Sequence, residues 1–338
     1  MSDTLLLRAD ADARIGTGHF MRMLALAEAW REGGGDATFG GRLPEALVPR
    51  ALAIGAKFVP RPEGTDDAEW TVALAGALGA TRVVADGYGF PLAFQRKVRA
   101  SGLRLAVVDD NAENAPYDAD WIVNVNFHAS QDLVSRRNAD ARCLLGPNFA
   151  LVRGEFRRSG ERRAPRDETP KVLVTMGGAD PPDATGAILD AFARRPPPKF
   201  ETIVLVGGAN PRLGSYTGRR IPRLTLAYNV EDVADIMRNV DVALAAIGAT
   251  TWELALSGVP SVVVALADNQ VPLAEILHAK GAVDYVGDVR VSRSAEPWLD
   301  RVDALLADPT RREALVNASR NLVDGRGASR IVQSLKEA

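Results

Sequence analysis

The chain has 338 residues, of which 46% are hydrophobic, 25% charged and 6% aromatic, and its formal net charge is −2. This composition is that of a globular protein and excludes a disordered or fibrous chain. The small net charge gives no general attraction to nucleic acid or to an anionic membrane, and a norm of ~150 residues per domain predicts two domains.

Cys143 is the single cysteine, which excludes an intrachain disulfide and a thiolate metal cluster and fits a reducing cytoplasm. The chain begins MSDTLLLRAD, without the basic segment or the longer apolar run of a signal peptide. No stretch approaches the ~18 apolar residues of a membrane span. We therefore expect a cytoplasmic protein that is neither secreted nor membrane-spanning.

In the first half, short apolar runs alternate with longer segments of helical period, which predicts βα units on a parallel sheet. The expected strands are Leu5–Arg8, Thr38–Gly40, Val83–Asp86, Leu105–Val108 and Ile122–Val125. The expected helices are His19–Arg31, Pro44–Ile54, Glu69–Leu78 and Pro91–Ala100. This half is interpreted as an N-terminal Rossmann-like domain over residues 1–153.

Residues 154–170 are dense in charge and poor in apolar side chains, which predicts a linker. The same rhythm then restarts in a second Rossmann-like domain, residues 171–338. Its expected strands are 171–178, 202–208, 224–229, 241–246 and 261–266, and its expected helices are Asp183–Arg194, Val233–Arg238, Thr250–Ser257 and Pro272–Lys280. The tail is helical, and its last helix, Ala328–Lys336, is expected to pack back on the first domain.

The loop after the first strand reads IGTGH and carries Gly16, Gly18 and His19 at the start of a helix. Glycines permit positive φ and close approach of a ligand, and a helix N-terminus offers amides to an anion. The loop lacks the third glycine and the later acidic residue of a dinucleotide fingerprint, so NAD binding is not expected. A neutral imidazole here can act as a general base, but a hydrogen bond to a loop carbonyl explains His19 equally well.

The rest of this helix is interpreted as a packing face. Its apolar side chains recur at helical spacing and comprise Phe20, Met23, Leu24, Ala27 and Trp30. We expect them to contact the sheet.

Two glycine loops of the second half are interpreted as phosphate sites. The first, VTMGGADPP, contains Gly177 and Gly178, with Asp180 as an expected N-cap and Pro181 and Pro182 at the first helical positions. The second, AAIGATTWE, follows a strand with Gly248 and with the hydroxyls of Thr250 and Thr251. Backbone amides and hydroxyls of such loops can bind a diphosphate.

Further polar residues are candidates for contacts with a sugar nucleotide. Glu253 is expected on the first turn of a helix. There it can bind ribose hydroxyls, or it can act only by a favourable interaction of its carboxylate with the helix dipole. Asp268, Asn269 and Gln270 follow a strand and can bind sugar hydroxyls and acetamido groups, or cap a helix.

In the first half, Tyr88 follows a strand and is expected to be exposed. Asp109 and Asp110 allow a metal or acid–base pair, but a turn and capping role is favoured, since no histidine adjoins them in the sequence.

Six segments together resemble the UDP-2,4-diacetamido-2,4,6-trideoxy-β-L-altropyranose hydrolases of pseudaminic acid biosynthesis. They are RADADARIGTGHFMRMLALA, DGYG, GPNFALVR, VTMGGAD, TTWELALSGVP and DNQ, and they run in order from about residue 4 to about residue 285. That family is similar to the inverting GT-B glycosyltransferases, including the enzyme that adds N-acetylglucosamine in peptidoglycan synthesis. The resemblance implies an α/β GT-B-like fold, with two doubly wound Rossmann-like domains and a cleft between them.

The resemblance also implies roles for individual residues. His19 matches the catalytic base, Tyr88 an active-site tyrosine, Glu253 the ribose-binding glutamate, and Asn269 a residue at the sugar. Thr250 and Thr251 match the diphosphate loop. Gly87 and the tail after Val291 depart from the family pattern, which bears on sugar selectivity.

The implied activity is metal-independent, inverting hydrolysis of a UDP-sugar, in a pathway that supplies flagellin glycosylation. We expect UDP to bind the second domain and His19 to activate water. The expected partner is the UDP-sugar alone, with no cofactor, metal, nucleic acid or membrane, and with a monomeric chain. The alternatives are a GT-B glycosyltransferase, a hydrolase of another UDP-sugar such as a hydrolysing 2-epimerase, and a nucleotide-sugar sensor without turnover.

Overall fold

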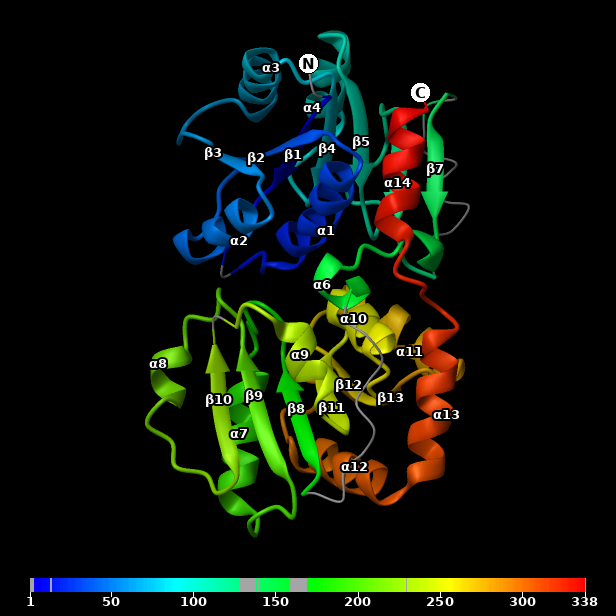
Figure 1. Ribbon diagram of the computed structural model, residues 1–338. Coiled ribbons are helices and arrows are strands. Elements are labelled where there is room, and N and C mark those ends of the chain that lie inside the picture. The colour runs from blue at the N-terminus through cyan, green and yellow to red at the C-terminus, as the bar shows by residue number, and fades with distance from the viewer. Residues whose placement is uncertain are drawn as a thin grey trace. The chain divides into compact units, whose positions relative to one another are not determined.

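The computed structural model describes residues 3–12, 14–127, 138, 140–158, 169–228 and 230–337 (Figure 1). Most of the predicted linker, residues 159–168, and Asn229 at the end of a predicted strand lie outside the described residues. The chain divides into two compact units. The N-terminal unit comprises Met1–Asp12, His19–Gly154 and Arg326–Ala338, and the C-terminal unit comprises Ala13–Gly18 and Glu155–Gly325.

In its described part, the N-terminal unit contains one parallel sheet of seven strands in the order β3-β2-β1-β4-β5-β6-β7. The strands are β1 (Thr4–Ala9), β2 (Asp36–Gly41), β3 (Lys57–Pro60), β4 (Arg82–Asp86), β5 (Arg104–Val108), β6 (Trp121–Asn124) and β7 (Arg142–Leu145). The chain winds outward from β1 to β3, then returns to β4 on the other side of β1. The β1/β4 pair is therefore the topological switch point, where such sheets bind ligands.

Helices cover both faces of this sheet, because successive strand residues point to opposite sides. The elements are α1 (Gly18–Glu32), α2 (Val48–Ala53), α3 (Asp67–Leu78), α4 (Leu92–Ala100) and α14 (Gly327–Lys336), with short turns η1 (Glu45–Leu47) and η2 (Pro147–Phe149). Leu5 and Leu7 join the core beneath α1 and α14, whereas Leu6 joins the core beneath α3 and α4. The packing face predicted for α1 is confirmed, since all five of its apolar side chains are buried.

The last helix, α14, belongs to the N-terminal unit although it follows the C-terminal unit in the chain. Its apolar residues, including Ile331 and Leu335, are buried in the core that α1 also covers. At its end, Trp121 Nε1 donates to Ser334 Oγ over 3.1 Å, and Arg82 Nε donates to the carbonyl of Leu335 over 2.8 Å. Apolar burial and these hydrogen bonds together fix α14 on the unit.

The C-terminal unit contains a second parallel sheet, of six strands in its described part, in the order β10-β9-β8-β11-β12-β13. The strands are β8 (Lys171–Thr175), β9 (Glu201–Val206), β10 (Leu224–Tyr228), β11 (Val242–Ala246), β12 (Ser261–Ala265) and β13 (Asp284–Asp288). Here the winding reverses between β8 and β11, which makes this pair the second switch point.

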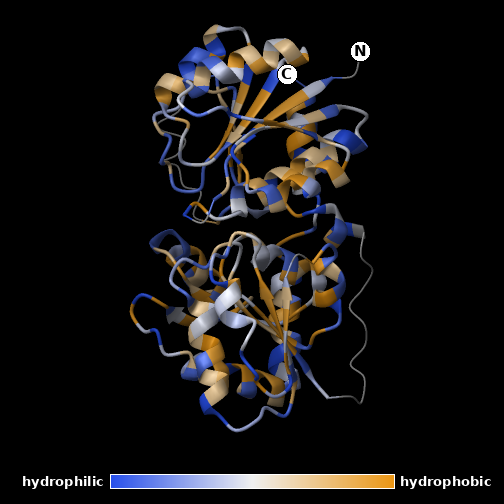
Figure 2. Cartoon of the chain, turned by 90° about the vertical axis from the view of Figure 1, so that its left-hand side faces the viewer, coloured by the Kyte–Doolittle hydropathy of each residue, from blue (hydrophilic) through white to orange (hydrophobic). Residues whose placement is uncertain are grey.

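Helices of the C-terminal unit follow most of these strands. They are α7 (Ala184–Arg194), α8 (Leu213–Tyr216), α9 (Val233–Arg238), α10 (Ala249–Ser257), α11 (Val271–Ala279), α12 (Glu296–Ala307) and α13 (Pro309–Arg320), with the short turn η3 (Asp268–Gln270). Helices α7 and α12 pack on one face of the sheet, over alternate residues of β8, β11 and β12. Figure 2 shows much of the strands near the middle of both sheets in the orange of hydrophobic residues. Within the described ranges, no helix combines the length and apolar character that crossing a bilayer demands.

Three strands were not predicted, and each lies at the edge of a sheet. They are β3, β7 and β13. An edge strand is covered on fewer sides, so it lacks the continuous apolar run that marks a central parallel strand. The start of the predicted linker also differs from expectation, since Gly154–Arg158 forms the short helix α6.

The packing of α14 predicts a stability cost for truncating it. Ile331→Ala should lower the free energy of unfolding by about 2–5 kcal/mol, because it removes buried apolar atoms and leaves a cavity. Urea unfolding measures this loss, with the exposed Gln333→Ala in the same helix as the control. Equal midpoints for the two variants would contradict the packing described for α14.

Candidate active site

His19 lies at the switch point of the N-terminal sheet, in the first turn of α1, and Asp86 ends the neighbouring strand β4. The Nδ1 atom of His19 is 2.7 Å from Asp86 Oδ1. An ionised carboxylate only accepts hydrogen bonds, so Nδ1 carries the hydrogen and donates it to Asp86. No hydrogen bond in the described part of the chain involves Nε2 of His19, which leaves its lone pair for a proton. This is the geometry of a histidine general base with an orienting carboxylate.

Arg22 follows His19 by one turn of α1 and joins two carboxylates. Its Nε and Nη2 atoms donate to Asp86 over 2.6 and 2.7 Å. Its Nη1 atom donates to both oxygens of Asp110 over 2.9 and 2.8 Å. Burial alone would raise the pKa of Asp86, but the charge of Arg22 and the contact with His19 outweigh it and hold that pKa below its ordinary value. Asp86 is therefore an anion at neutral pH.

Tyr88 lies beside His19, with the ring centroids 4.8 Å apart and the rings edge to face. The side chain is exposed, as expected from the sequence. Partial desolvation of the phenol by its neighbours, together with the charges of Glu113 and Asp110, raises the pKa of Tyr88 above its ordinary value. The phenol is thus neutral at neutral pH and can donate a hydrogen bond to a substrate or to water.

The two aspartates after β5 have separate roles. Asp109 accepts hydrogen bonds from the amides of Asn111 and Asn114, which confirms the predicted turn role. Asp110 binds Arg22 instead, and Nδ2 of Asn126 donates to it over 2.9 Å. This pairing was not predicted, because Arg22 and Asp110 meet only once β5 is placed beyond β4 in the sheet.

In the C-terminal unit, the N-terminus of α7 is already occupied by carboxylates. Asp183 is the N-cap, so the prediction of Asp180 as the N-cap, with Pro181 and Pro182 at the first helical positions, is wrong. Asp180 still reaches the helix from outside and accepts from the amides of Ala184 and Thr185, each over 2.8 Å. These amides are therefore not available to a phosphate.

The N-terminus of α10, at the same switch point, has no side-chain cap, because its N-cap is Gly248. The amide of Thr251 donates to the carbonyl of Gly248 over 3.0 Å. Amides at a helix start that lack such an acceptor can bind an anion. Thr250 is half-buried here. Thr251 is buried, and its Oγ1 accepts from the amide of Gly248 over 3.1 Å. Of the two predicted hydroxyls, Thr250 is the better candidate for a phosphate.

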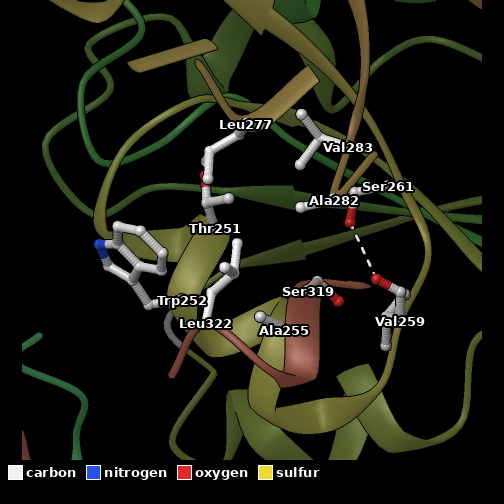
Figure 3. Close-up of a pocket in the computed structure, with 10 residues that line it drawn as sticks. All are labelled: Thr251, Trp252, Ala255, Val259, Ser261, Leu277, Ala282, Val283, Ser319 and Leu322. Atoms are coloured by element: carbon white, nitrogen blue, oxygen red, sulfur yellow. Dashed lines mark hydrogen bonds between the residues drawn. The ribbon is translucent and has the colours of Figure 1, made fainter. Parts of the chain in front are cut away.

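Thr251 also lines a small cavity behind α10, together with Ser261, Leu277 and Ser319 (Figure 3). Its volume is about 10 Å³, which suits at most one water molecule. This cavity is too small for a sugar nucleotide, so it is not the candidate site.

The remaining predicted residues of the C-terminal unit differ in exposure. Glu253 lies beyond the first turn of α10 and is 7% exposed, so its predicted first-turn position is wrong. Asn269 is exposed in η3, the turn that follows β12, where a ligand can reach it. Gln270 Oε1 accepts from the amide of Leu266 over 2.7 Å, which assigns its carbonyl to the turn. Asp268 is exposed and paired with Arg290.

The glycines predicted at the site have different structural reasons. Gly16 and Gly177 have φ of +83° and +78°, which a residue with a side chain adopts only with strain. Gly18 begins α1 and does not adopt the positive φ that glycine permits. At Gly178, a Cβ would collide with the side chain of Thr17. This packing alone explains why the residue is glycine, and no bound ligand is needed to explain it.

Asp86 and Arg22 are the residues that sequence reasoning missed. Asp86 is the first residue of the DGYG segment and ends a predicted strand. Arg22 follows His19 by three residues in the segment RADADARIGTGHFMRMLALA. Ligand sites of such sheets form at the carboxyl ends of the strands that flank a switch point, and this rule could have indicated Asp86. Among the described residues, no three side chains of metal-ligating type gather in one group.

No protein-family model matches the chain. It is 22% identical over 335 residues to the spore coat polysaccharide biosynthesis protein SpsG of Bacillus subtilis, covering 97% of this chain and 96% of that protein.

Among solved structures, the spinosyn rhamnosyltransferase SpnG has a TM-score of 0.69 at 16% identity, over 99% of this chain and 100% of that one. A structure of SpnG with thymidine diphosphate has a TM-score of 0.67 at 16% identity, with the same coverage. MurG of Acinetobacter baumannii has a TM-score of 0.60 at 13% identity, over 100% of both chains. The protein therefore has the GT-B fold, built from two Rossmann-like α/β units.

The contacts of Asp86 predict a stability that depends on pH. Asp86→Asn should lower the free energy of unfolding at pH 7 by about 3 kcal/mol, the low end for breaking a buried ion pair. The loss is at the low end because the guanidinium of Arg22 remains paired with Asp110. Because the folded-state pKa of Asp86 is lowered, its stabilisation is complete above the ordinary carboxyl pKa of about 4 and is lost as pH falls through the folded-state pKa.

Urea unfolding from pH 7 down to pH 3 measures this difference. Asp118→Asn is the control, since its ion pair with Arg99 is partly exposed and should be worth under about 1 kcal/mol. A loss in Asp86→Asn that is the same at every pH would contradict an ionised Asp86.

Proposed function

We propose that this protein hydrolyses a UDP-2,4-diacetamido-2,4,6-trideoxyhexose to UDP and the free sugar, with inversion at the anomeric carbon, in pseudaminic acid biosynthesis. The observation that carries the proposal is the His19–Asp86 pair at the β1/β4 switch point, beside Tyr88, with no hydrogen bond from the described residues to Nε2 of His19. The choice of sugar follows the resemblance of the sequence motifs. The relation to a polysaccharide biosynthesis protein supports a carbohydrate substrate.

In the proposed reaction, a water molecule attacks the anomeric carbon and gives its proton to Nε2 of His19. The bond between that carbon and the β-phosphate oxygen breaks, and its electron pair leaves with UDP. Asp86 stabilises the imidazolium that forms. UDP is a stable anion, so the leaving oxygen needs charge stabilisation more than a proton.

We place the diphosphate at the N-terminus of α10, where uncapped amides and the hydroxyl of Thr250 can donate to it. Thymidine diphosphate in complex with SpnG, which shares the fold, supports nucleoside diphosphate binding. Glu253 remains the proposed ribose contact and Asn269 a proposed sugar contact. The proposal requires that the anomeric carbon of the bound nucleotide sugar reaches His19.

The first test follows UDP release from the candidate UDP-sugar. His19→Leu should lower kcat by ~10²–10⁴-fold, the usual contribution of a general base, while the Kd for UDP stays nearly unchanged. His278→Gln is the control, because the ring of His278 contacts backbone atoms of Val283 and Tyr285 in the C-terminal unit.

The same assay separates the alternatives. A glycosyltransferase would release UDP only with an added acceptor, and a sensor would release none. Unchanged turnover in His19→Leu would refute the role of His19 as base.

A second test concerns Tyr88, whose phenol we assign to orienting water or His19. Tyr88→Phe keeps the ring and removes one hydrogen bond, so kcat should fall by about 2- to 10-fold. Steady-state kinetics on the same substrate measure the effect. Complete loss of turnover would instead give Tyr88 a direct part in the chemistry.

A further inference from the structure

Arg22 does more than neutralise one buried carboxylate. Its guanidinium donates to both oxygens of Asp86 and to both oxygens of Asp110, which uses its planar fork on two sides. Its Nη2 atom also lies 3.2 Å from Nδ1 of His19. Only 9% of the residue is exposed, so solvent screens these charges weakly.

The charges that face His19 come from three parts of the N-terminal unit. Asp86 ends β4 and Tyr88 follows it, Arg22 lies on α1, and Asp110 and Glu113 follow β5. The carboxylates favour protonated imidazole, whereas the guanidinium opposes it. A general base must be neutral before it takes a proton, so this balance decides the fraction of active enzyme.

We propose that Arg22 is a positioning residue for His19. It fixes the carboxylate of Asp86 against Nδ1 of His19 and offsets the charge of that carboxylate, so that the ring hydrogen stays on Nδ1 and the lone pair on Nε2. Asp110 sets the strength of this offset, because it shares the guanidinium and is itself held by Asn126. The inference rests on the proposed function for its catalytic consequence.

Charge substitutions on the two sides of Arg22 have opposite expected effects. Arg22→Met removes a positive charge beside His19, so the acid limb of the kcat profile should move to higher pH by about 1 unit. Asp110→Asn removes a negative charge that partly cancels the positive charge of Arg22. Protonated imidazole is then less favoured, so the same limb should move to lower pH. A purely structural role for Arg22 predicts no such opposition, since both variants would only loosen the site.

The experiment measures kcat and KM against pH for UDP-sugar hydrolysis. Arg22→Met should lower kcat at neutral pH by about 10- to 100-fold with KM within about twofold, the pattern of a lost transition-state effect. Arg22→Lys should recover the position of the acid limb but not all of kcat, because an ammonium cannot bind two carboxylates bidentately. If Arg22→Met does not fold, Arg22→Lys and Asp110→Asn carry the test.

Arg301→Met is the matched control. Arg301 also donates to both oxygens of a buried carboxylate, that of Asp284, over 3.0 and 2.7 Å, and it lies in the C-terminal unit. Its kcat and acid limb should match those of the unmodified protein. A shift of Arg22→Met and Asp110→Asn in the same direction, or no shift in either, would overturn the proposal.

A readout without substrate separates this proposal from the proposed function. Ring ¹⁵N spectra report the tautomer and protonation of each of the three histidines, and His19→Gln identifies the signal of His19. The Nδ1–H tautomer is expected at neutral pH, with a titration midpoint that rises in Arg22→Met and falls in Asp110→Asn. These shifts without any UDP release would refute only the hydrolase, whereas UDP release without these shifts would refute only the role of Arg22.

Discussion

The carboxylate of Asp86 is fully buried at the end of a central strand, and the candidate site is organised around its neutralisation. An isolated carboxylate in such a place would cost several kcal/mol. Arg22 neutralises this charge and His19 donates a hydrogen bond to it, and both residues lie in the first turns of α1. The same interaction therefore ties α1 to β4, orients the imidazole and keeps one ring nitrogen free.

The two units apply one architecture to two different chemical tasks. Each has a doubly wound sheet, and each places its candidate residues near the carboxyl ends of the switch-point strands. In the N-terminal unit these are titratable groups, His19 and Arg22 on α1 and Asp86 at the end of β4. In the C-terminal unit the helix α10 presents uncapped amides, while α7 is closed by Asp180 and Asp183. This division fits a proton acceptor in one unit and an anion site in the other.

The central strands and most long helices were predictable from the sequence, because burial on both faces of a parallel sheet imposes continuous apolar runs. The edge strands β3, β7 and β13 lacked this signal. His19 and Tyr88 were found by motif, but the Asp86 and Arg22 network depends on strand order, which one sequence does not reveal. Thr251 and Gln270 were predicted as ligand contacts from residue type and spacing. In the structure their side-chain oxygens accept from the backbone amides of Gly248 and Leu266, because of the direction in which each side chain points.

In the proposed reaction water attacks the anomeric carbon, and the position of an oxygen label tests this step most directly. Reaction of the UDP-sugar in H₂¹⁸O, followed by mass spectrometry, should place one ¹⁸O at the anomeric carbon of the sugar and none in UDP. Label in the β-phosphate of UDP would show cleavage of the phosphorus–oxygen bond instead. That result would contradict His19 as the base for attack at carbon.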